Sequence, residues 1–197
     1  KNDAEAVAVI RAAGFDTLDL DLLFTSNPAF VLRLDHWERE VENIGLAAER
    51  LGMTIGQVHL PRVDNWVDDF DSSGLSAIYD ECMRRACIAV NMLRIPVTVV
   101  HPREYPERDD QLRYTREENI RYFSRYADLC MSAGAIFTFE NMPPFKKIKT
   151  AYRFGSRYEN LIELTGAFHD ARIGVCWDTG HANLSGVDQA TAGRSLG

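Results

Sequence analysis

The chain has 197 residues, 46% of them hydrophobic and 26% charged, which suffices for one folded domain with a sizeable core. Its formal net charge of −7 disfavours a surface built to hold the phosphate backbone of nucleic acid, and no apolar run reaches the length of a membrane span. The four cysteines form no C-x-x-C pair and stand in apolar segments, which predicts reduced, mostly buried thiols in the cytoplasm.

Helical and strand-like patterns alternate along the chain. Period-two and β-branched segments predict strands at residues 16–22, 54–61, 96–102, 135–144 (a strand with its following loop) and 172–178. Amphipathic segments bounded by serine, threonine and glycine predict helices at residues 3–13, 36–51, 72–93, 115–133 and 156–168, with one more after Gly186.

This alternation predicts an α/β fold with a parallel sheet, formed by residues 1–197 as a single domain. The spacing of the units favours a (β/α)8 barrel over a doubly wound sheet, its structural rival. A full barrel has eight strands in about 250 residues. We therefore expect an incomplete TIM barrel of about five or six strands, in which the first strand and the last two are missing.

Polar side chains end the last four predicted strands. They are His59, His101, Glu140 and Asp178, with His181 just beyond the last one. In parallel β/α folds these ends meet on one face, where ligands bind. A histidine in "VHLP" or "VVHP" is by itself more often structural. A carboxylate directly after "IFTF" must be hydrogen-bonded, paired or on a metal, and imidazoles with carboxylates suit a divalent ion: Mn, Mg, Co or Zn.

The segments "AGFDTLDL", "QVHLP", "VVHP", "FENMP" and "CWDTGHAN" resemble the xylose-isomerase-like barrel superfamily, in that family's order. It holds sugar and sugar-phosphate isomerases and epimerases, inosose dehydratases and zinc-dependent apurinic-site endonucleases. The resemblance implies that Glu140 and Asp178 are two of four metal ligands, with the remaining His and Glu on the missing strands. It also implies that His181 binds a substrate oxygen.

The preferred hypothesis is a metal-dependent isomerase or epimerase of a sugar, a sugar phosphate or a related polyol, working through a cis-enediolate. Glu140 and His181 would be catalytic. His59, His101 and Trp66 would bind substrate together with His181, and Trp66 would stand against sugar C–H faces. The expected partner is a small carbohydrate, without nucleic acid or membrane, and a homo-oligomer is compatible with the resemblance.

Three alternatives stay open at this point. An inosose-type dehydratase would form the same enediolate and expel a β-hydroxyl. A zinc-dependent apurinic-site endonuclease would use His59, His101 and His181 as further ligands, with the basic run at 144–149 near phosphate. A degenerate barrel fragment would keep only a binding role, because an open parallel sheet leaves its edges exposed.

Overall fold

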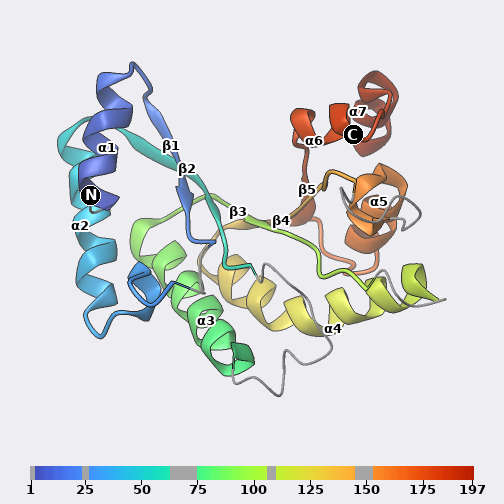
Figure 1. Ribbon diagram of the computed structural model, residues 1–197, viewed down its shortest axis with the longest axis horizontal. Coiled ribbons are helices and arrows are strands. Elements are labelled where there is room, and N and C mark those ends of the chain that lie inside the picture. Colours follow the sequence, from blue (N-terminus) through green and yellow to red (C-terminus); the bar gives the residue numbers. More distant parts are fainter. Residues whose placement is uncertain (1–2, 24–26, 63–74, 106–109, 145–152) are drawn as a thin grey trace. The chain divides into compact units, whose positions relative to one another are not determined.

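The computed structural model describes residues 3–23, 27–62, 75–105, 110–144 and 153–197 (Figure 1). The five strands are β1 (Thr17–Asp21), β2 (Thr54–His59), β3 (Val97–Val100), β4 (Ile136–Glu140) and β5 (Ile173–Cys176). The helices are α1 (Asp3–Ala12), η1 (Val31–Arg33), α2 (Trp37–Arg50), α3 (Leu75–Leu93), α4 (Gln111–Ser132), η2 (Phe154–Ser156), α5 (Tyr158–Gly166), α6 (Thr179–Leu184) and α7 (Gln189–Leu196).

The strands form one parallel sheet in the order β1-β2-β3-β4-β5. A doubly wound sheet would interrupt the chain order at a switch point, so this order is that of consecutive strands in a (β/α)8 barrel. The predicted α/β class is confirmed, with five strands of a partial barrel. Contacts divide the chain into two compact units, Lys1–Thr98 with Leu129–Ile136, and Val99–Asp128 with Phe137–Gly197. The single domain therefore stays a prediction.

In the first unit, apolar side chains at strand spacing and at helical spacing form the core. Leu18 and Leu20 are the buried, alternate residues of β1, as period two requires. On α2 the buried Val41, Ile44 and Ala48 recur at helical spacing. Helices α1 and α2 lie side by side (Figure 1). Burying each large aliphatic side chain stabilises the fold by about 1.5–3 kcal/mol.

A bulge in β2 sets which side chains face Asp19. Leu18 pairs with Ile55 and Asp19 pairs with Gln57, so Gly56 is the extra residue. A Cβ at Gly56 would lie 2.6 Å from the Thr17 Cγ2 atom, so a larger residue would require the Thr17 side chain to move.

Buried thiols pack in the first unit as predicted. Cys82, Cys87 and Cys130 are buried and form no disulfide, and Cys176 of the second unit is half-buried. Burial raises the pKa of Cys82 to about 11, which keeps this thiol neutral and unreactive.

In the second unit, alternation along β4 decides where Glu140 points. Phe137 and Phe139 lie on one face and contact Phe123 of α4 at ring distances of 6.1 and 5.5 Å. Phe168 packs on Phe139 at 5.6 Å. Successive side chains of a strand point to opposite faces of the sheet. The two phenylalanines therefore face helix α4, and Glu140 projects from the opposite face.

Three predicted elements were wrong in detail. Helix α4 begins at Gln111, one turn before the predicted start at Thr115. Thr115 is thus a residue of the helix, and its side chain is buried. Ser156 does not cap α5: its hydroxyl donates to the Arg153 carbonyl, and Arg157 is the residue at the helix start. Strand β5 covers only Ile173–Cys176 of the predicted residues 172–178, and it lies at the edge of the sheet.

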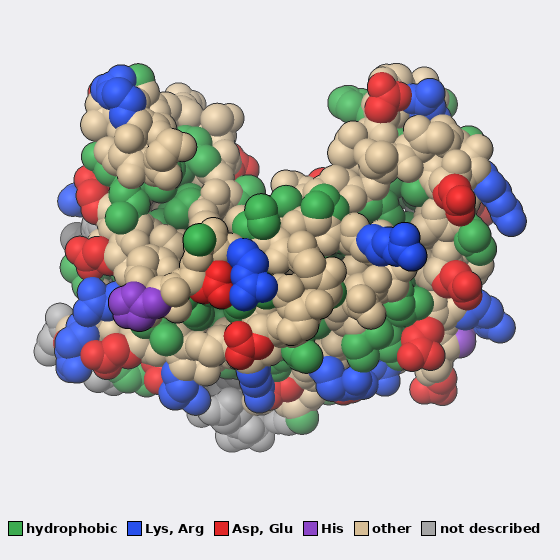
Figure 2. All heavy atoms as spheres, turned by 180° about the vertical axis from the view of Figure 1, so that it is seen from behind, with side chains coloured by type: hydrophobic (Ala, Val, Ile, Leu, Met, Phe, Trp, Pro, Cys, Tyr) green, Lys and Arg blue, Asp and Glu red, His purple; other side chains and the backbone are tan. Residues whose placement is uncertain are grey.

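Among the described residues, no helix is long and apolar enough to cross a membrane. On the face drawn in Figure 2, basic and acidic side chains are interspersed rather than gathered by sign. The absence of nucleic-acid partners stays a prediction.

Candidate functional site

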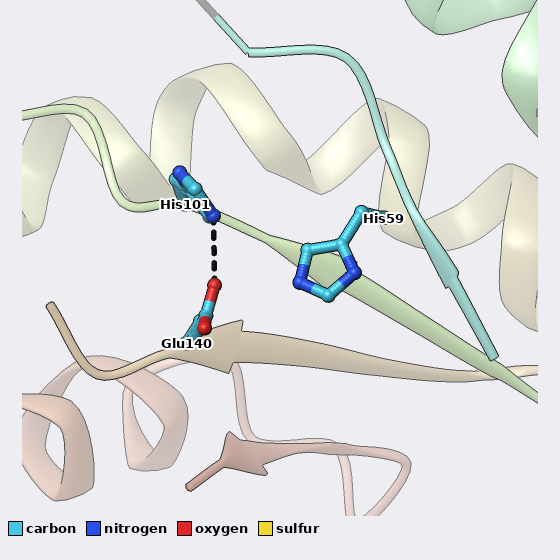
Figure 3. Close-up of side chains that lie close together, drawn as sticks. All are labelled: His59, His101 and Glu140. Carbon is cyan, nitrogen blue, oxygen red and sulfur yellow. Dashed lines mark ion pairs between the residues drawn. The ribbon is translucent and has the colours of Figure 1, made fainter. Parts of the chain in front are cut away.

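Glu140 is the last residue of β4, and its carboxylate is buried between two imidazoles. Its side chain is only 6% exposed. The Oε2 atom lies 2.7 Å from Nε2 of His101, the residue that directly follows β3 (Figure 3). The Oε1 atom lies 3.4 Å from Nδ1 of His181. A buried carboxylate needs such partners, because an isolated charge is costly away from water.

Asp178 stands two residues beyond β5 and has a structural task. It is the N-cap of α6, where its Oδ1 atom accepts a hydrogen bond from the His181 backbone N–H at 2.7 Å. Its side chain is 37% exposed, and its Oδ2 atom lies 3.7 Å from His181 Nδ1. A Cβ at Gly180 would approach Oδ1 to 3.1 Å, so the glycine leaves the carboxylate room.

His181 lies in the first turn of α6. Its Nδ1 atom is 2.8 Å from the backbone carbonyl oxygen of Asn141. The ring is about one-quarter exposed, so part of it remains open to solvent.

These residues form a donor set that fits a divalent cation. Glu140, Asp178 and His181 each offer a ligand atom, and these atoms lie within 4.8 Å of one another. Two carboxylates and an imidazole are the donors that Mn, Mg, Co and Zn ions share. The buried charge of Glu140 further favours a cation at this position. The second unit therefore brings together both predicted metal ligands, with His101 at Glu140.

His59, a predicted substrate-binding residue, belongs to the first unit. Its Nδ1 atom lies 3.0 Å from Oδ1 of Asp19, and Oδ2 of Asp19 accepts a hydrogen bond from Gln57 Nε2 at 2.8 Å. The side chain is 16% exposed. This pairing gives His59 a structural role, and substrate binding stays a prediction. Trp66 lies outside the described residues.

Two site features have no counterpart among the predicted residues. Asn141 was part of the "EN" motif without a role, and its side chain bonds the backbone of Asp178. Glu104 follows β3 and is buried against Arg153 at 2.9 Å. Only a charged residue within an otherwise loop-like segment could have drawn attention to the second feature.

Known proteins resemble the chain over most of its length. A family model described as a xylose isomerase-like TIM barrel matches residues 7–195. The uncharacterized protein MJ1311 of Methanocaldococcus jannaschii is 29% identical over 107 residues, which are 54% of this chain and 35% of that protein.

Solved structures share the fold at low identity. A D-tagatose 3-epimerase-like protein superposes with a TM-score of 0.73 at 22% identity, over 96% of this chain and 65% of its own. The 3-keto-D-glucoside 4-epimerase YcjR of E. coli superposes with a TM-score of 0.68 at 14% identity, over 100% of this chain and 70% of its own. The probable 3-DHS dehydratase AsbF of Bacillus anthracis, involved in petrobactin synthesis, superposes with a TM-score of 0.67 at 14% identity. The superposition covers 98% of this chain and 63% of that protein.

The chain thus spans about two thirds of the length of these structures and about one third of that of its archaeal relative. The predicted family is confirmed by the extent of the model match and by the fold: the chain belongs to the xylose isomerase-like TIM barrel family.

Proposed function

We propose that the chain carries the site of a metal-dependent isomerase or epimerase that acts on a sugar or a related polyol. The observation that carries this proposal is the buried Glu140 carboxylate, held between His101 and His181 next to Asp178. Such an arrangement keeps a base and a cation-binding group at the same strand end. The epimerases and the dehydratase among the similar structures support this class of chemistry.

Glu140 and Asp178 would hold the divalent cation. When bound, it polarises the carbonyl of a hydroxy-ketone and acidifies the neighbouring C–H bond. This role fits Mn, Mg, Co or Zn, because the donors are two carboxylates with an imidazole nearby.

Glu140 is the candidate base. Its carboxylate accepts the proton from the carbon next to the carbonyl, and the electron pair of the C–H bond forms the enediolate of the sugar. Return of the proton to the neighbouring carbon moves the carbonyl, which is isomerisation. Return to the same carbon from the opposite face inverts it, which is epimerisation and requires a second acid.

The two histidines have different tasks in this proposal. His101, whose Nε2 lies 2.7 Å from Glu140 Oε2, holds the carboxylate in place. His181, which is partly exposed, binds a substrate oxygen. Loss of a β-hydroxyl from the same enediolate would make the enzyme a dehydratase instead.

Deuterium incorporation tests the proposal. The chain is incubated with Mn²⁺ and a panel of ketoses in heavy water, and NMR follows exchange at carbon next to the carbonyl. We expect exchange with at least one ketose, and a rate at least about 100-fold lower in Glu140→Gln, in line with the usual contribution of a general base. Loss of water in the product would identify the dehydratase.

Asp170→Asn is the matched control. It also removes one carboxylate of the second unit, but Asp170 is half-buried and pairs with the exposed Arg172 before β5. Its exchange rate should equal that of the wild type. No exchange with any ketose, or full exchange in Glu140→Gln, would overturn the proposal.

A further inference from the structure

The side chain of Asn141 continues the pairing of β4 with β5 beyond the end of the strands. The last residue pair in register is Glu140 with Cys176, and the Asn141 backbone N–H donates to the Cys176 carbonyl at 3.2 Å. Beyond this point the Asn141 carboxamide replaces the backbone. Its Oδ1 accepts from the Asp178 N–H, and its Nδ2 donates to the Asp178 carbonyl at 2.9 Å.

A side-chain amide can form both bonds, because it has an acceptor and a donor side by side. Asn141 is 2% exposed, so solvent does not compete for either group. The chain uses the same device once more, where Asn119 accepts from the Arg103 N–H at 2.8 Å and donates to its carbonyl at 2.9 Å. The bonds from Asn141 fix the backbone of Asp178, and therefore the position from which its carboxylate side chain extends.

The backbone of Asn141 also fixes the ring of His181. Its carbonyl oxygen lies 2.8 Å from Nδ1 and can only accept a hydrogen bond. Two carboxylate oxygens also lie near Nδ1, Glu140 Oε1 at 3.4 Å and Asp178 Oδ2 at 3.7 Å. The neutral ring therefore carries its proton on Nδ1 and keeps the lone pair of Nε2 for another partner.

We propose that Asn141 is the positioning residue of the site: its carboxamide sets Asp178, and its carbonyl oxygen sets the tautomer and orientation of His181. His181 then offers Nε2, and not Nδ1, to a substrate oxygen or a cation. We call the two hydrogen bonds from the Asn141 carboxamide to the Asp178 backbone the Asn141 clamp. The role of His181 toward a substrate rests on the proposed function, whereas the His181 tautomer and the Asn141 clamp do not.

Two measurements on the metal-free wild-type chain test the geometry. Nitrogen-15 NMR of the histidine rings should give the Nδ1–H tautomer for His181, and hydrogen exchange should give a protected Asp178 amide. An Nε2–H tautomer or a rapidly exchanging Asp178 amide would overturn the proposal, whether or not any variant folds.

The variant Asn141→Ala tests the consequence, with Mn²⁺ as the probe in equilibrium dialysis. We expect the Asp178 amide to lose protection and Mn²⁺ affinity to fall about 10- to 100-fold, as for other residues that orient metal ligands. The His181 ring should keep its Nδ1–H tautomer, because alanine retains the backbone carbonyl that accepts from Nδ1. The matched control is Asn160→Ala, which removes a carboxamide bond to the Phe154 carbonyl at 2.9 Å and should leave all three readouts unchanged.

Wild-type protection of the Asp178 amide together with wild-type Mn²⁺ affinity in Asn141→Ala would refute the positioning role. None of these readouts requires turnover. If they behave as expected and no ketose exchanges deuterium, the clamp stands and the isomerase proposal fails. If deuterium exchanges but Asn141→Ala binds Mn²⁺ normally, the isomerase stands and the clamp fails.

Discussion

Asp178 has two tasks, and its two carboxylate oxygens divide them. Oδ1 caps helix α6 through the His181 N–H, and Oδ2 is directed toward the group of ligand atoms. An N-cap explains an aspartate at a helix start without any metal. The two roles can be separated because asparagine caps helices about as well as aspartate but lacks the negative charge.

We expect Asp178→Asn to lower Mn²⁺ affinity at least about tenfold, with an unchanged far-UV circular dichroism spectrum and unfolding midpoint. Equilibrium dialysis and thermal unfolding measure the two effects. The control is Asp188→Asn, since Asp188 caps α7 in the same manner through Ala190 and Thr191. If Asp178 only caps α6, the two variants will bind Mn²⁺ equally well.

At the scale of elements, a buried ion pair joins the loops that follow β3 and β4. Glu104 Oε1 accepts from Arg153 Nε at 2.9 Å, and its Oε2 accepts from the Phe154 N–H at 3.1 Å. Arg153 also donates to the Pro143 carbonyl at 3.0 Å, three residues beyond Glu140. Burial raises the pKa of Glu104, and Arg153 opposes this rise.

Arg153→Met should destabilise the chain by about 3 kcal/mol at neutral pH, because the Glu104 carboxylate stays buried without its cation. The deficit should shrink as the pH falls, since the neutral acid no longer needs a counter-charge. Urea unfolding at several pH values measures this. Arg172→Met removes an exposed partner of Asp170 and should leave the midpoint unchanged. A deficit that does not change with pH would contradict the explanation.

The sequence predicted the elements whose signal is local. Alternation gave β1 and β4, and the polar residue after each strand gave Glu140 and Asp178. The six-residue helix α6 was missed because it is too short for a periodic pattern. Pairing of Asn141 with Asp178, 37 residues away, depends on strand neighbours that no local pattern encodes.

At the scale of the whole molecule, the proposed metal ligands all come from one compact unit. Glu140 and Asp178 lie in the unit formed by Val99–Asp128 and Phe137–Gly197, whereas His59 lies in the other. The isomerase proposal needs no ligand from the first unit. The endonuclease alternative does, because it also requires His59.

Mn²⁺ at about 100 times its dissociation constant should stabilise the binding unit by about 2.7 kcal/mol. Hydrogen exchange followed by mass spectrometry should then slow up to about 100-fold for β4 and β5, and little for β1 and β2. The variant Asp178→Asn, at the same Mn²⁺ concentration, is the control. Equal slowing of β2 would instead favour a cluster that includes His59.

The bonds from the Asn141 carboxamide to Asp178 also tie the site to the chemical integrity of one side-chain amide. Side-chain amides are among the thermolabile groups of proteins. Loss of ammonia from Asn141 would replace the Nδ2 donor with a carboxylate oxygen facing the Asp178 carbonyl, next to the charge of Glu140. A stored sample would then lose its cation-binding capacity while its helices and strands stayed intact, so spectroscopic purity would overstate the fraction of competent protein.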